Sequence, residues 1–364
     1  MAEGQRGGRV KRVGGLWDTL VSMGNVHEAV RRAALGKRKR PDVAAFLLNV
    51  ETELVSLRSE LQSGEYRPGP YREFTTNDGK PRLISAAPFR DRVVHHALTQ
   101  VLEPVFERRF SKDSYACRAG LGTHKALARA KWGAARFSHV LKCDVRKYFA
   151  SIDHQVLKGL LARVVKCRRT LDLAGRIIDG SNQQEEVILY FPEDDLFTPV
   201  ERRRGLPLGN QTSQFFANVY LNPLDHFVNQ SLGPACYIRY VDDFVLFDDC
   251  KERLAGMRAA VEGLLDGLRL RLHERKSRVY RCADGLTFLG WRVFPERTRL
   301  VRANVVRFRR RLRGMERAYA EGTMCGNDVR TRIHSWIGHA SFGDTWRLRK
   351  QVFGQFTLVK RSAV

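Results

Sequence analysis

Two adjacent aspartates, Asp242 and Asp243, stand in the middle of an apolar, strand-like stretch over residues 237–247. A second strand-like stretch, residues 139–145, carries Asp144. Aspartate is rare in strands, and an ionised carboxylate beside Val, Phe and Leu destabilises a fold unless a cation compensates its charge. The fold therefore has to bring a cation to these carboxylates, and a divalent metal ion is the simplest choice.

Two further Asp-Asp pairs provide a comparison. Asp194-Asp195 lies in a polar segment and Asp248-Asp249 at a strand end, where we expect water to solvate the carboxylates. Of the three pairs, only Asp242-Asp243 is enclosed by apolar residues on both sides. Carboxylate oxygens without a His or Cys ligand set favour Mg²⁺, with Mn²⁺ as a substitute. The alternative to a metal site is an acidic hairpin turn paired with some of the many arginines.

The chain is strongly basic. Its 64 Lys and Arg against 39 Asp and Glu give a formal net charge of +25, which suits a polyanionic partner. One cluster, ending in Arg38 and Arg40, precedes Pro41, and a second lies on a predicted helix over residues 301–319. The apolar stripe of that helix is Val301, Val305, Phe308, Leu312, Met315 and Tyr319, and its other faces carry Arg302, Arg307, Arg309, Arg310, Arg311, Arg313 and Arg317. We expect this arginine helix to lie along a phosphate backbone.

Other features exclude several classes of protein. With 43% hydrophobic residues the chain can build a core, which excludes a disordered basic tail. It has no apolar stretch long enough to span a bilayer and no signal-peptide pattern, so we expect no membrane association and a cytoplasmic location. The seven cysteines are never closer than 14 residues, which indicates reduced thiols rather than a zinc site. His95 and His96 are adjacent in a predicted helix and are interpreted as packing or surface residues.

The order of predicted elements indicates an α+β fold with a mostly antiparallel sheet. Helices are predicted over residues 42–62, 92–106, from about 154 with Asp153 as N-cap, 210–222 and 251–268; hairpins over 71–86 and around 242; and short strands up to 294. Residues 172–204 are polar and turn-rich, and we expect an inserted loop there. A boundary near Pro295 precedes the arginine helix and a helical C-terminal region.

Several of these segments resemble motifs of reverse transcriptases. Tyr240-Val-Asp-Asp-Phe is similar to their YxDD hairpin, and residues 142–153 resemble the strand that supplies their other metal-binding aspartate. Segments 80–85, 272–276 and 286–291 resemble the fingers and later palm motifs in the family order. The resemblance implies a right-hand polymerase fold. Its parts would be a basic N-terminal extension and helix (1–65), fingers and palm (66–294, with the 172–204 insertion) and a helical thumb (295–364).

One motif narrows the resemblance. Where retroviral and group II intron enzymes usually have Gln-Gly and then Ser-Pro, this chain has Leu208-Gly209 and then Ser213-Gln214. That form resembles reverse transcriptases of diversity-generating retroelements of bacteria and phages. Residues 69–74, 90–97, 115–118 and 336–340 are also similar to that family. The resemblance implies an enzyme that copies a template-repeat RNA into adenine-mutagenised cDNA, using dNTPs and a primer. It also implies a partner, a small basic accessory protein that forms a homo-oligomeric ring.

The resemblance also assigns roles to residues. The catalytic residues are Asp144, Asp242 and Asp243, and the ligands of two Mg²⁺ ions are the same three with Val145. Nucleotide-binding residues are Lys80, Arg82, Phe149, Leu208, Gly209, Gln214 and Lys276. Nucleic-acid-binding residues are Arg38, Arg40, Gly290, Trp291, Arg302, Arg309, Arg310 and Arg313.

The proposed chemistry of these residues follows from their side chains. Asp144 and Asp242 would hold two metal ions about 3.5–4 Å apart, with Asp243 in a smaller role. Lys80 and Arg82 would clamp the triphosphate, unless they only face solvent on a hairpin. Lys276 would protonate pyrophosphate, or serve only as an ion-pair partner.

Two of the nucleotide-binding residues bear on selectivity. The ring of Phe149 would leave no room for a ribose 2′-hydroxyl, so that DNA rather than RNA is made. Leu208 replaces a hydrogen-bonding Gln, which offers a reason for low fidelity.

Two other functions stay open at the level of sequence. The chain is alternatively another bacterial reverse transcriptase, of retron, group II intron or phage-defence type. A catalytically silent RNA-binding protein with the same fold is the remaining possibility, although all three aspartates are present.

Overall fold

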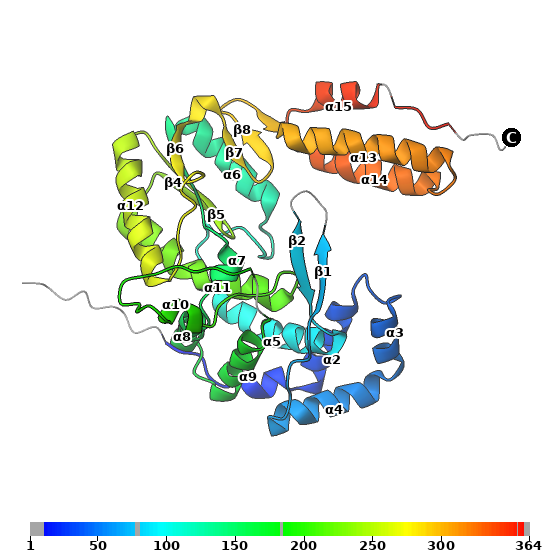
Figure 1. The fold of residues 1–364 in the computed structure, drawn as a ribbon, viewed down its shortest axis with the longest axis vertical. Coiled ribbons are helices and arrows are strands. Elements are labelled where there is room, and N and C mark those ends of the chain that lie inside the picture. The colour runs from blue at the N-terminus through cyan, green and yellow to red at the C-terminus, as the bar shows by residue number, and fades with distance from the viewer. Residues whose placement is uncertain (1–10, 77–80, 183–184, 355, 360–364) are drawn as a thin grey trace, which may run out of the picture. The chain divides into compact units, whose positions relative to one another are not determined.

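The computed structural model describes residues 11–76, 81–182, 185–354 and 356–359. The chain divides into two compact units, each built from separate stretches of sequence (Figure 1). Unit 1 contains Met1–Arg118, Asp144–Leu232 and Ala259–His273, and unit 2 contains Ala119–Cys143, Gly233–Arg258 and Glu274–Val364. This division does not follow the three consecutive parts expected from the sequence, so the subdomain limits stay a prediction.

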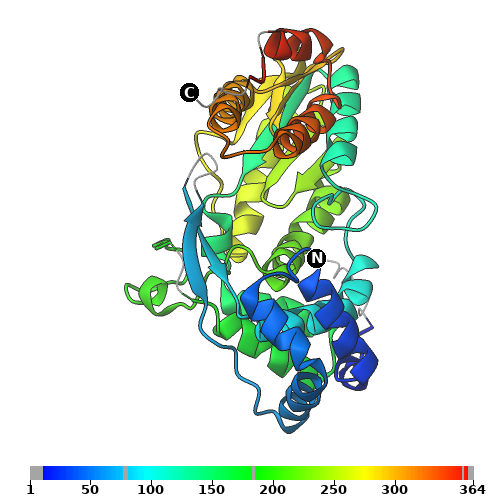
Figure 2. The same ribbon diagram turned by 90° about the vertical axis from the view of Figure 1, so that its right-hand side faces the viewer.

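Unit 1 is mainly helical. Its elements are α1 (Leu16–Leu20), α2 (Met23–Ala34), α3 (Pro41–Leu48), α4 (Val50–Ser63), β1 (Arg72–Thr76), β2 (Arg82–Ala86), α5 (Phe89–Glu107), α7 (Tyr148–Ser151), α8 (His154–Val164), α9 (Arg168–Asp179), α10 (Thr198–Glu201), α11 (Gln211–Phe227) and the π-helix η1 (Val228–Leu232). The helix α5 is buried along much of its length and packs against α2 and α11. The antiparallel β1–β2 hairpin projects from these helices (Figure 2).

Unit 2 contains the sheet with the aspartate strands, a second three-stranded sheet and the C-terminal helices. Its elements are α6 (Thr123–Arg136), β3 (His139–Asp144), β4 (Cys236–Tyr240), β5 (Asp243–Asp248), β6 (Arg278–Arg281), the 3₁₀-helix η2 (Cys282–Asp284), β7 (Leu286–Phe288), β8 (Trp291–Val293), β9 (Thr298–Leu300), α13 (Arg302–Ala320), α14 (Gly326–Ala340) and α15 (Trp346–Phe353). The end of β3 and the second half of α12 (Lys251–Gly267) pass into unit 1.

The sheet that carries the aspartates has four strands in the order β4-β5-β3-β6. Two of its pairings are antiparallel: β4 pairs with β5, and β3 pairs with β6 from His139 opposite Arg281 to Lys142 opposite Arg278. A second antiparallel sheet, β7-β8-β9, leads into α13. The expected α+β class with antiparallel sheets is confirmed.

Local signals explain most element boundaries. Asp153 caps α8 by accepting a hydrogen bond from the Val156 amide at 2.9 Å, as its sequence position predicts. Gly64 ends α4 in the left-handed conformation (φ 79°), which glycine adopts without steric cost. On α13, Val305, Phe308, Leu312 and Met315 are buried, which confirms the predicted apolar stripe. The helix lies beside α14 (Figure 1).

Three expectations are wrong. The helix predicted over 42–62 is two helices, α3 and α4, because the backbone leaves the helical conformation at Asn49 (φ −114°). The segment 172–204 is not a loop throughout, since α9 occupies Arg168–Asp179 and α10 occupies Thr198–Glu201. Short strands are expected only up to residue 294, but β9 occupies Thr298–Leu300, so the sheet continues further along the chain.

The histidine in the core of α5 makes folding stability depend on pH. His95 is 1% exposed, neither ring nitrogen has a hydrogen-bond partner among the described residues, and burial lowers its pKa to about 3. The unfolded chain therefore binds a proton below about pH 6.5 that the folded chain does not. Stability conferred by the neutral ring is present above that pH and decreases as the pH falls towards 3.

We predict that His95→Leu makes the free energy of unfolding less dependent on pH. Leucine buries a similar volume without a titrating group or unsatisfied nitrogens. Urea unfolding at pH 7 and pH 5 should show a smaller loss of stability in the variant than in the wild type. His27→Gln, which changes an exposed histidine, is the control. Equal pH dependence in His95→Leu and the wild type would contradict the prediction.

Candidate active site

The aspartate hairpin has a strained turn that a buried arginine supports. In the register of β4 and β5, Tyr240 lies opposite Asp243, so Val241 and Asp242 form the turn. Val241 has φ 58°, an unfavourable conformation for a β-branched residue. The fully buried Arg239 donates a hydrogen bond from Nη1 to the Val241 carbonyl at 3.0 Å. Strain that the surroundings hold in place is typical of functional turns.

The end of β3 is held by a neighbouring segment of unit 1. The His273 amide donates a hydrogen bond to the Asp144 carbonyl at 2.7 Å, and Val145 forms an antiparallel bridge with Leu272. Val145 is buried, whereas the Asp144 side chain is half-buried. The backbone at the predicted metal ligand Asp144 is therefore fixed on both sides of the residue.

The strands that carry the aspartates are neighbours. Asp144 is the last residue of β3 and Asp243 the first residue of β5, and β3 and β5 lie side by side in the sheet. Lys142 on β3 forms an ion pair with Asp243 on β5, with 3.3 Å between Nζ and Oδ2. This lysine supplies part of the positive charge that the sequence led us to expect. Its signal in the sequence is a lysine two residues before Asp144, in an otherwise apolar strand.

The donor chemistry of the three aspartates fits a hard divalent cation. Their side chains are half-buried, and their ligand atoms are carboxylate oxygens, as Mg²⁺ prefers. Within the described part of the chain, no three or more His, Cys, Asp or Glu side chains form a metal-binding group. Mg²⁺ is commonly held by one or two carboxylates and completed by water and substrate phosphates, so the protein does not need such a group.

The two comparison pairs of aspartates are neutralised locally. Asp194 forms an ion pair with Arg202, and Asp195 accepts hydrogen bonds at the start of α10. Asp248 forms an ion pair with Arg253 at 2.8 Å. The expectation that solvation alone suffices is wrong for Asp194 and Asp248, which have guanidinium partners.

A basic pocket lies beside Lys142 in unit 2. Its lining residues are Lys142, Arg275, Lys276, Arg278, Tyr280, Gly285 and Thr287. Lys142 also donates a hydrogen bond to the Thr287 carbonyl at 2.8 Å. Four cations around one pocket make it a site for an anionic group, and Lys276 is the member that the sequence assigned to phosphate chemistry. Arg275 and Arg278 were missed, because basic residues are frequent throughout this chain.

In unit 1, Phe149 lies on the short helix α7, which two hydrogen bonds hold in place. The buried Tyr148 hydroxyl donates to the Ala217 carbonyl of α11 at 2.6 Å. The Leu206 amide donates to the Phe149 carbonyl at 2.8 Å. The Phe149 ring itself is half-buried. Its position is therefore set by α11 and by the segment that leads to Leu208.

The same segment continues to the β1–β2 hairpin. The Ser85 amide of β2 donates to the Leu208 carbonyl at 3.2 Å. Gly209 has φ 106°, and a Cβ atom there would lie 2.9 Å from Cγ2 of Ile84, so a glycine is required. The structure thus brings Phe149, Leu208 and Gly209 into one connected region with β2.

The remaining nucleotide-binding candidates are placed as follows. Arg82 is exposed at the first position of β2, and Lys80 lies outside the described residues. Gln214 is exposed on α11, where its side-chain oxygen accepts a hydrogen bond from Cys117 at 3.5 Å.

The candidates for nucleic-acid contact differ in exposure. Those exposed are Arg38 and Arg40 before α3, and Arg302, Arg309, Arg310 and Arg313 on α13. Trp291 is fully buried and packs against Phe342 and His339, with ring centroids 5.7 and 5.2 Å away. A role for its indole in direct nucleic-acid contact is therefore wrong. Gly290 precedes it in a left-handed turn (φ 82°), where its carbonyl accepts hydrogen bonds from Val301 and Asn304.

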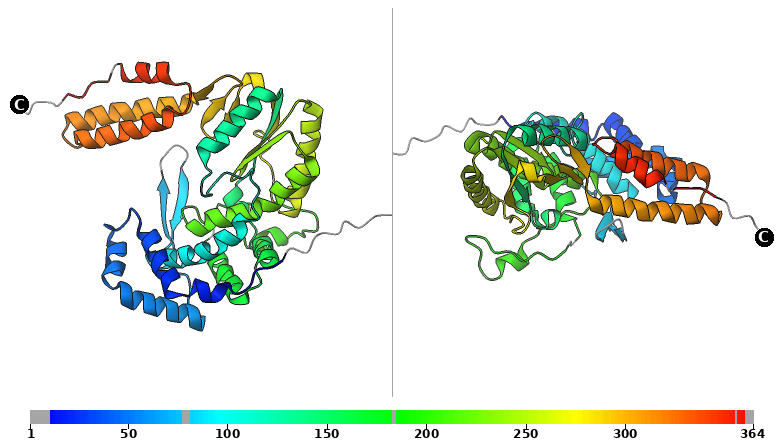
Figure 3. Two further views of the ribbon diagram at one scale, coloured as in Figure 1. Left: turned by 180° about the vertical axis from the view of Figure 1, so that it is seen from behind. Right: turned by 90° about the horizontal axis from the view of Figure 1, so that it is seen from above.

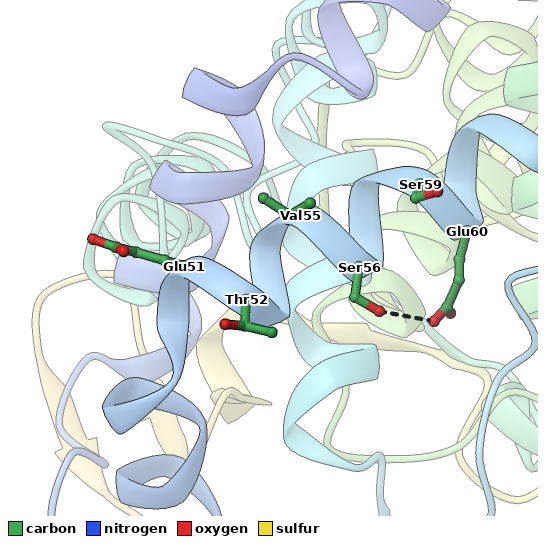
Figure 4. A pocket seen from close by; sticks show the side chains of 6 residues that line it. All are labelled: Glu51, Thr52, Val55, Ser56, Ser59 and Glu60. Carbon is green, nitrogen blue, oxygen red and sulfur yellow. Dashed lines mark hydrogen bonds between the residues drawn. The ribbon is translucent and has the colours of Figure 1, made fainter.

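A surface pocket along α4 has no such chemistry. Figure 4 shows its lining side chains, all from this one helix: Glu51, Thr52, Val55, Ser56, Ser59 and Glu60. The hydroxyl of Ser56 donates a hydrogen bond to Glu60 at 3.3 Å. The lining includes no cation, and the carboxylate of Glu60 is already paired with Arg90 at 2.7 Å, so we assign the pocket no function.

Comparisons with known proteins agree with the arrangement of strands and motifs. Residues 74–293 match the family model of reverse transcriptase (RNA-dependent DNA polymerase). Protein YkfC of Escherichia coli K12 is 28% identical over 294 residues, which cover 70% of this chain and 74% of that protein. The group II intron-encoded protein LtrA of Lactococcus lactis is 26% identical over 185 residues, half of this chain and 29% of LtrA.

The chain also resembles a plant intron maturase. The mitochondrial nuclear intron maturase 1 of Arabidopsis thaliana is 39% identical over 98 residues, 26% of this chain and 14% of that protein. Among the described residues, no helix is both long and apolar enough to cross a bilayer. The family match spans more than half of the chain and contains both aspartate strands, and the chain therefore belongs to the reverse transcriptases, the RNA-dependent DNA polymerases.

Proposed function

We propose that this RNA-directed DNA polymerase copies a template-repeat RNA into adenine-mutagenised cDNA for a diversity-generating retroelement. The observation that carries the proposal is the motif Leu208-Gly209 followed by Ser213-Gln214, in place of Gln-Gly and Ser-Pro. Leu208 lies in the region connected to Phe149 and β2. An apolar side chain there has no hydrogen bond to offer a nascent base pair, so it relaxes control of pair geometry without removing catalytic groups.

The polymerase chemistry proposed for the site uses magnesium held by Asp144 and Asp242. Magnesium bound there would polarise the primer 3′-hydroxyl and neutralise the triphosphate. The chain's own residues do the rest. Asp243 is oriented by Lys142, the basic pocket containing Lys276 receives the phosphate charge, and Lys276 donates a proton to pyrophosphate as it leaves.

A ribonucleoprotein is the proposed working form. The resemblance to diversity-generating enzymes implies a small basic accessory protein, and this chain carries a net charge of +25. Two basic proteins repel unless a shared RNA neutralises them, so assembly should weaken steeply with salt.

A second candidate function is that of a group II intron-type enzyme. It is favoured by the similarity to LtrA and to an intron maturase, although the matched parts cover less than a third of either protein. The two candidates differ in the errors they make. An intron enzyme is not expected to misincorporate preferentially opposite template adenine, whereas the proposed function requires errors concentrated at template adenines.

The test is the error spectrum of purified enzyme on a primed RNA template that contains all four bases. Sequencing of the cDNA should show misincorporation opposite adenine well above that opposite the other three bases. Even error rates opposite all four template bases would reject the diversity-generating function while leaving the polymerase activity intact.

We predict that Leu208→Gln lowers misincorporation opposite template adenine. A glutamine can hydrogen-bond near the nascent pair and penalise poor geometry, and an interaction of about 1 kcal/mol corresponds to a change of about fivefold. The measurement is the cDNA error spectrum on the same template. Leu208→Met, which stays apolar and similar in volume, is the matched control. An unaltered error spectrum in Leu208→Gln would contradict the role of this position.

A further inference from the structure

The outer side of α6 forms a basic face. Lys125, Arg129, Trp132 and Arg136 are spaced by four, three and four residues and therefore lie along one side of the helix, with Lys131 beside them. Lys125, Lys131, Trp132 and Arg136 are exposed and Arg129 is half-exposed. We call these five residues the α6 basic face. From Lys125 to Arg136 the helix rises by about 16.5 Å, long enough to meet several consecutive phosphates.

The opposite side of α6 is built for close packing within unit 2. Its buried residues are Ala126, Leu127, Ala130, Gly133 and Ala134. A Cβ atom on Gly133 would lie 2.9 Å from the ring of Phe247, so the helix lies directly against β5. The view from behind in Figure 3 shows α6 as the outer layer over the strands of this unit. The basic face is therefore turned away from the sheet that carries the aspartates.

The charges on this face are not neutralised by the protein. Residues 119–143 include no Asp or Glu. Within the described ranges, no ion pair joins Lys125, Arg129, Lys131 or Arg136 to a carboxylate. Like charges four residues apart on a helix destabilise it, as for Lys125 and Arg129. A solvated helix would normally intersperse acids among such residues, as α2 does when Glu28 pairs with Arg31 and Arg32.

An exposed tryptophan organises two of the guanidinium groups. The Cζ atoms of Arg129 and Arg136 lie 4.1 and 4.8 Å from the Trp132 ring centroid. Trp132 nevertheless stays 36% exposed. Arginines restrained by contact with a ring lose less entropy on binding, and their N–H groups stay available for phosphates.

The basic surface continues past the end of α6. A groove there is lined by Arg136, Phe137, His139 and Arg281, together with small residues and Pro295. Arg281 is exposed, which adds another cation to the groove that Arg136 lines. The carboxylate of Asp249 marks one limit of the surface, and it is already bound to the amide and hydroxyl of Ser138.

We propose that the α6 basic face binds the phosphate backbone of a structured RNA, at a site separate from the primer-template site. Phosphates are recognised by cationic side chains, and this face offers arginines in contact with an aromatic ring and lysines without acidic neighbours. An interface with an acidic protein would also include carboxylates at its rim, and residues 119–143 contain no Asp or Glu. The site gives the polymerase a second hold on the RNA that it copies. This proposal rests on the chain's membership of the reverse transcriptases, and it does not depend on which RNA is the template.

The test compares two variants that each remove four positive charges. The first is Lys125→Gln, Arg129→Gln, Lys131→Gln and Arg136→Gln together. The control is Lys112→Gln, Arg163→Gln, Lys166→Gln and Arg168→Gln, all exposed cations of unit 1. Binding of a labelled, fully paired RNA hairpin is measured with excess unlabelled primer-template present, between about 50 and about 200 mM salt. DNA of the same sequence is tested in parallel.

The α6 variant should bind the RNA hairpin at least about tenfold more weakly, with a salt slope smaller by about 3. Its kcat/KM on a short primer-template should stay within about twofold of the wild type, because no residue of the face touches the reacting groups. Equal RNA binding by the α6 variant and the control would overturn the proposal. DNA binding that falls as much as RNA binding would show that the face recognises phosphates of either source, and would overturn the assignment to RNA.

A second measurement uses the unmodified enzyme. Bound RNA hairpin should protect Lys125 and Lys131 from acetylation, while Lys166 stays reactive. Polyglutamate of equal charge should protect these lysines much less. Absence of protection by RNA, or equal protection by polyglutamate, would overturn the proposal independently of how any variant folds.

Discussion

Asp242→Asn should abolish primer extension on an RNA template, lowering kcat by about 10³-fold or more. A catalytic metal ion contributes several kcal/mol of transition-state stabilisation, and each 1.36 kcal/mol is worth tenfold in rate. Asparagine keeps the shape of the side chain but removes the negative charge that would hold the ion. Chelation of divalent metal with EDTA should reduce the wild-type rate similarly, and added Mg²⁺ should restore it.

Folding should survive this substitution. The turn is held through backbone groups, by the register of β4 with β5 and by the hydrogen bond from Arg239 to the Val241 carbonyl. A half-buried ionised carboxylate in a turn between apolar strands is costly, so the amide should leave the melting temperature unchanged or raise it. Loss of activity with undiminished stability is the signature of a residue kept for function.

The control for this experiment is Asp249→Asn, in another Asp-Asp pair. Asp249 accepts hydrogen bonds from Ser138 and lies at the other end of β5, beyond Asp248. Its substitution should leave the extension rate within about twofold of the wild type. Measurable extension by Asp242→Asn at more than a tenth of the wild-type rate would show that Asp242 is not a principal metal ligand.

The sequence predicts this hairpin well because its signal is local. A polar pair between two runs of β-branched and aromatic residues specifies both the turn and the strands beside it. The arginine helix is equally local, because its buried stripe from Val305 to Met315 repeats over about three turns of α13. Features that depend on a single element of sequence were therefore predictable.

The features that the sequence did not predict depend on contacts between residues far apart in the chain, or on the residue at which a predicted segment begins. Trp291 is buried because Phe342 and Gly343, some 50 residues later, pack against it. The ion pair between Lys142 and Asp243 requires β3 and β5 to be neighbours in the sheet, and no local sequence pattern predicts which strands are neighbours. In α9, the buried residues Leu173, Ala174, Ile177 and Ile178 do follow a helical period. The predicted loop begins at residue 172, inside α9, so it divides this helical pattern between two predicted segments.

Phe149→Ala should allow the enzyme to incorporate ribonucleotides. If the Phe149 ring lies under the sugar of the incoming nucleotide, it excludes a 2′-hydroxyl by contact, and alanine leaves space for it. Contacts of this kind discriminate by about 1–3 kcal/mol, so the preference for dNTP over rNTP should fall about 10- to 200-fold. The backbone of α7 should stay in place, because the bonds from Leu206 and from Tyr148 do not involve the Phe149 side chain.

The measurement is kcat/KM for one dNTP and the matching rNTP on the same primed RNA template. Extension with dNTP should stay within a few-fold of the wild type, which shows that the catalytic aspartates still work in the variant. Phe149→Tyr keeps a ring of the same width and should keep the wild-type preference. An unchanged dNTP preference in Phe149→Ala would mean that another side chain reads the sugar. A fall in dNTP and rNTP incorporation by the same factor would mean that the ring supports the fold of the site rather than its selectivity, because selectivity depends only on the ratio of the two rates.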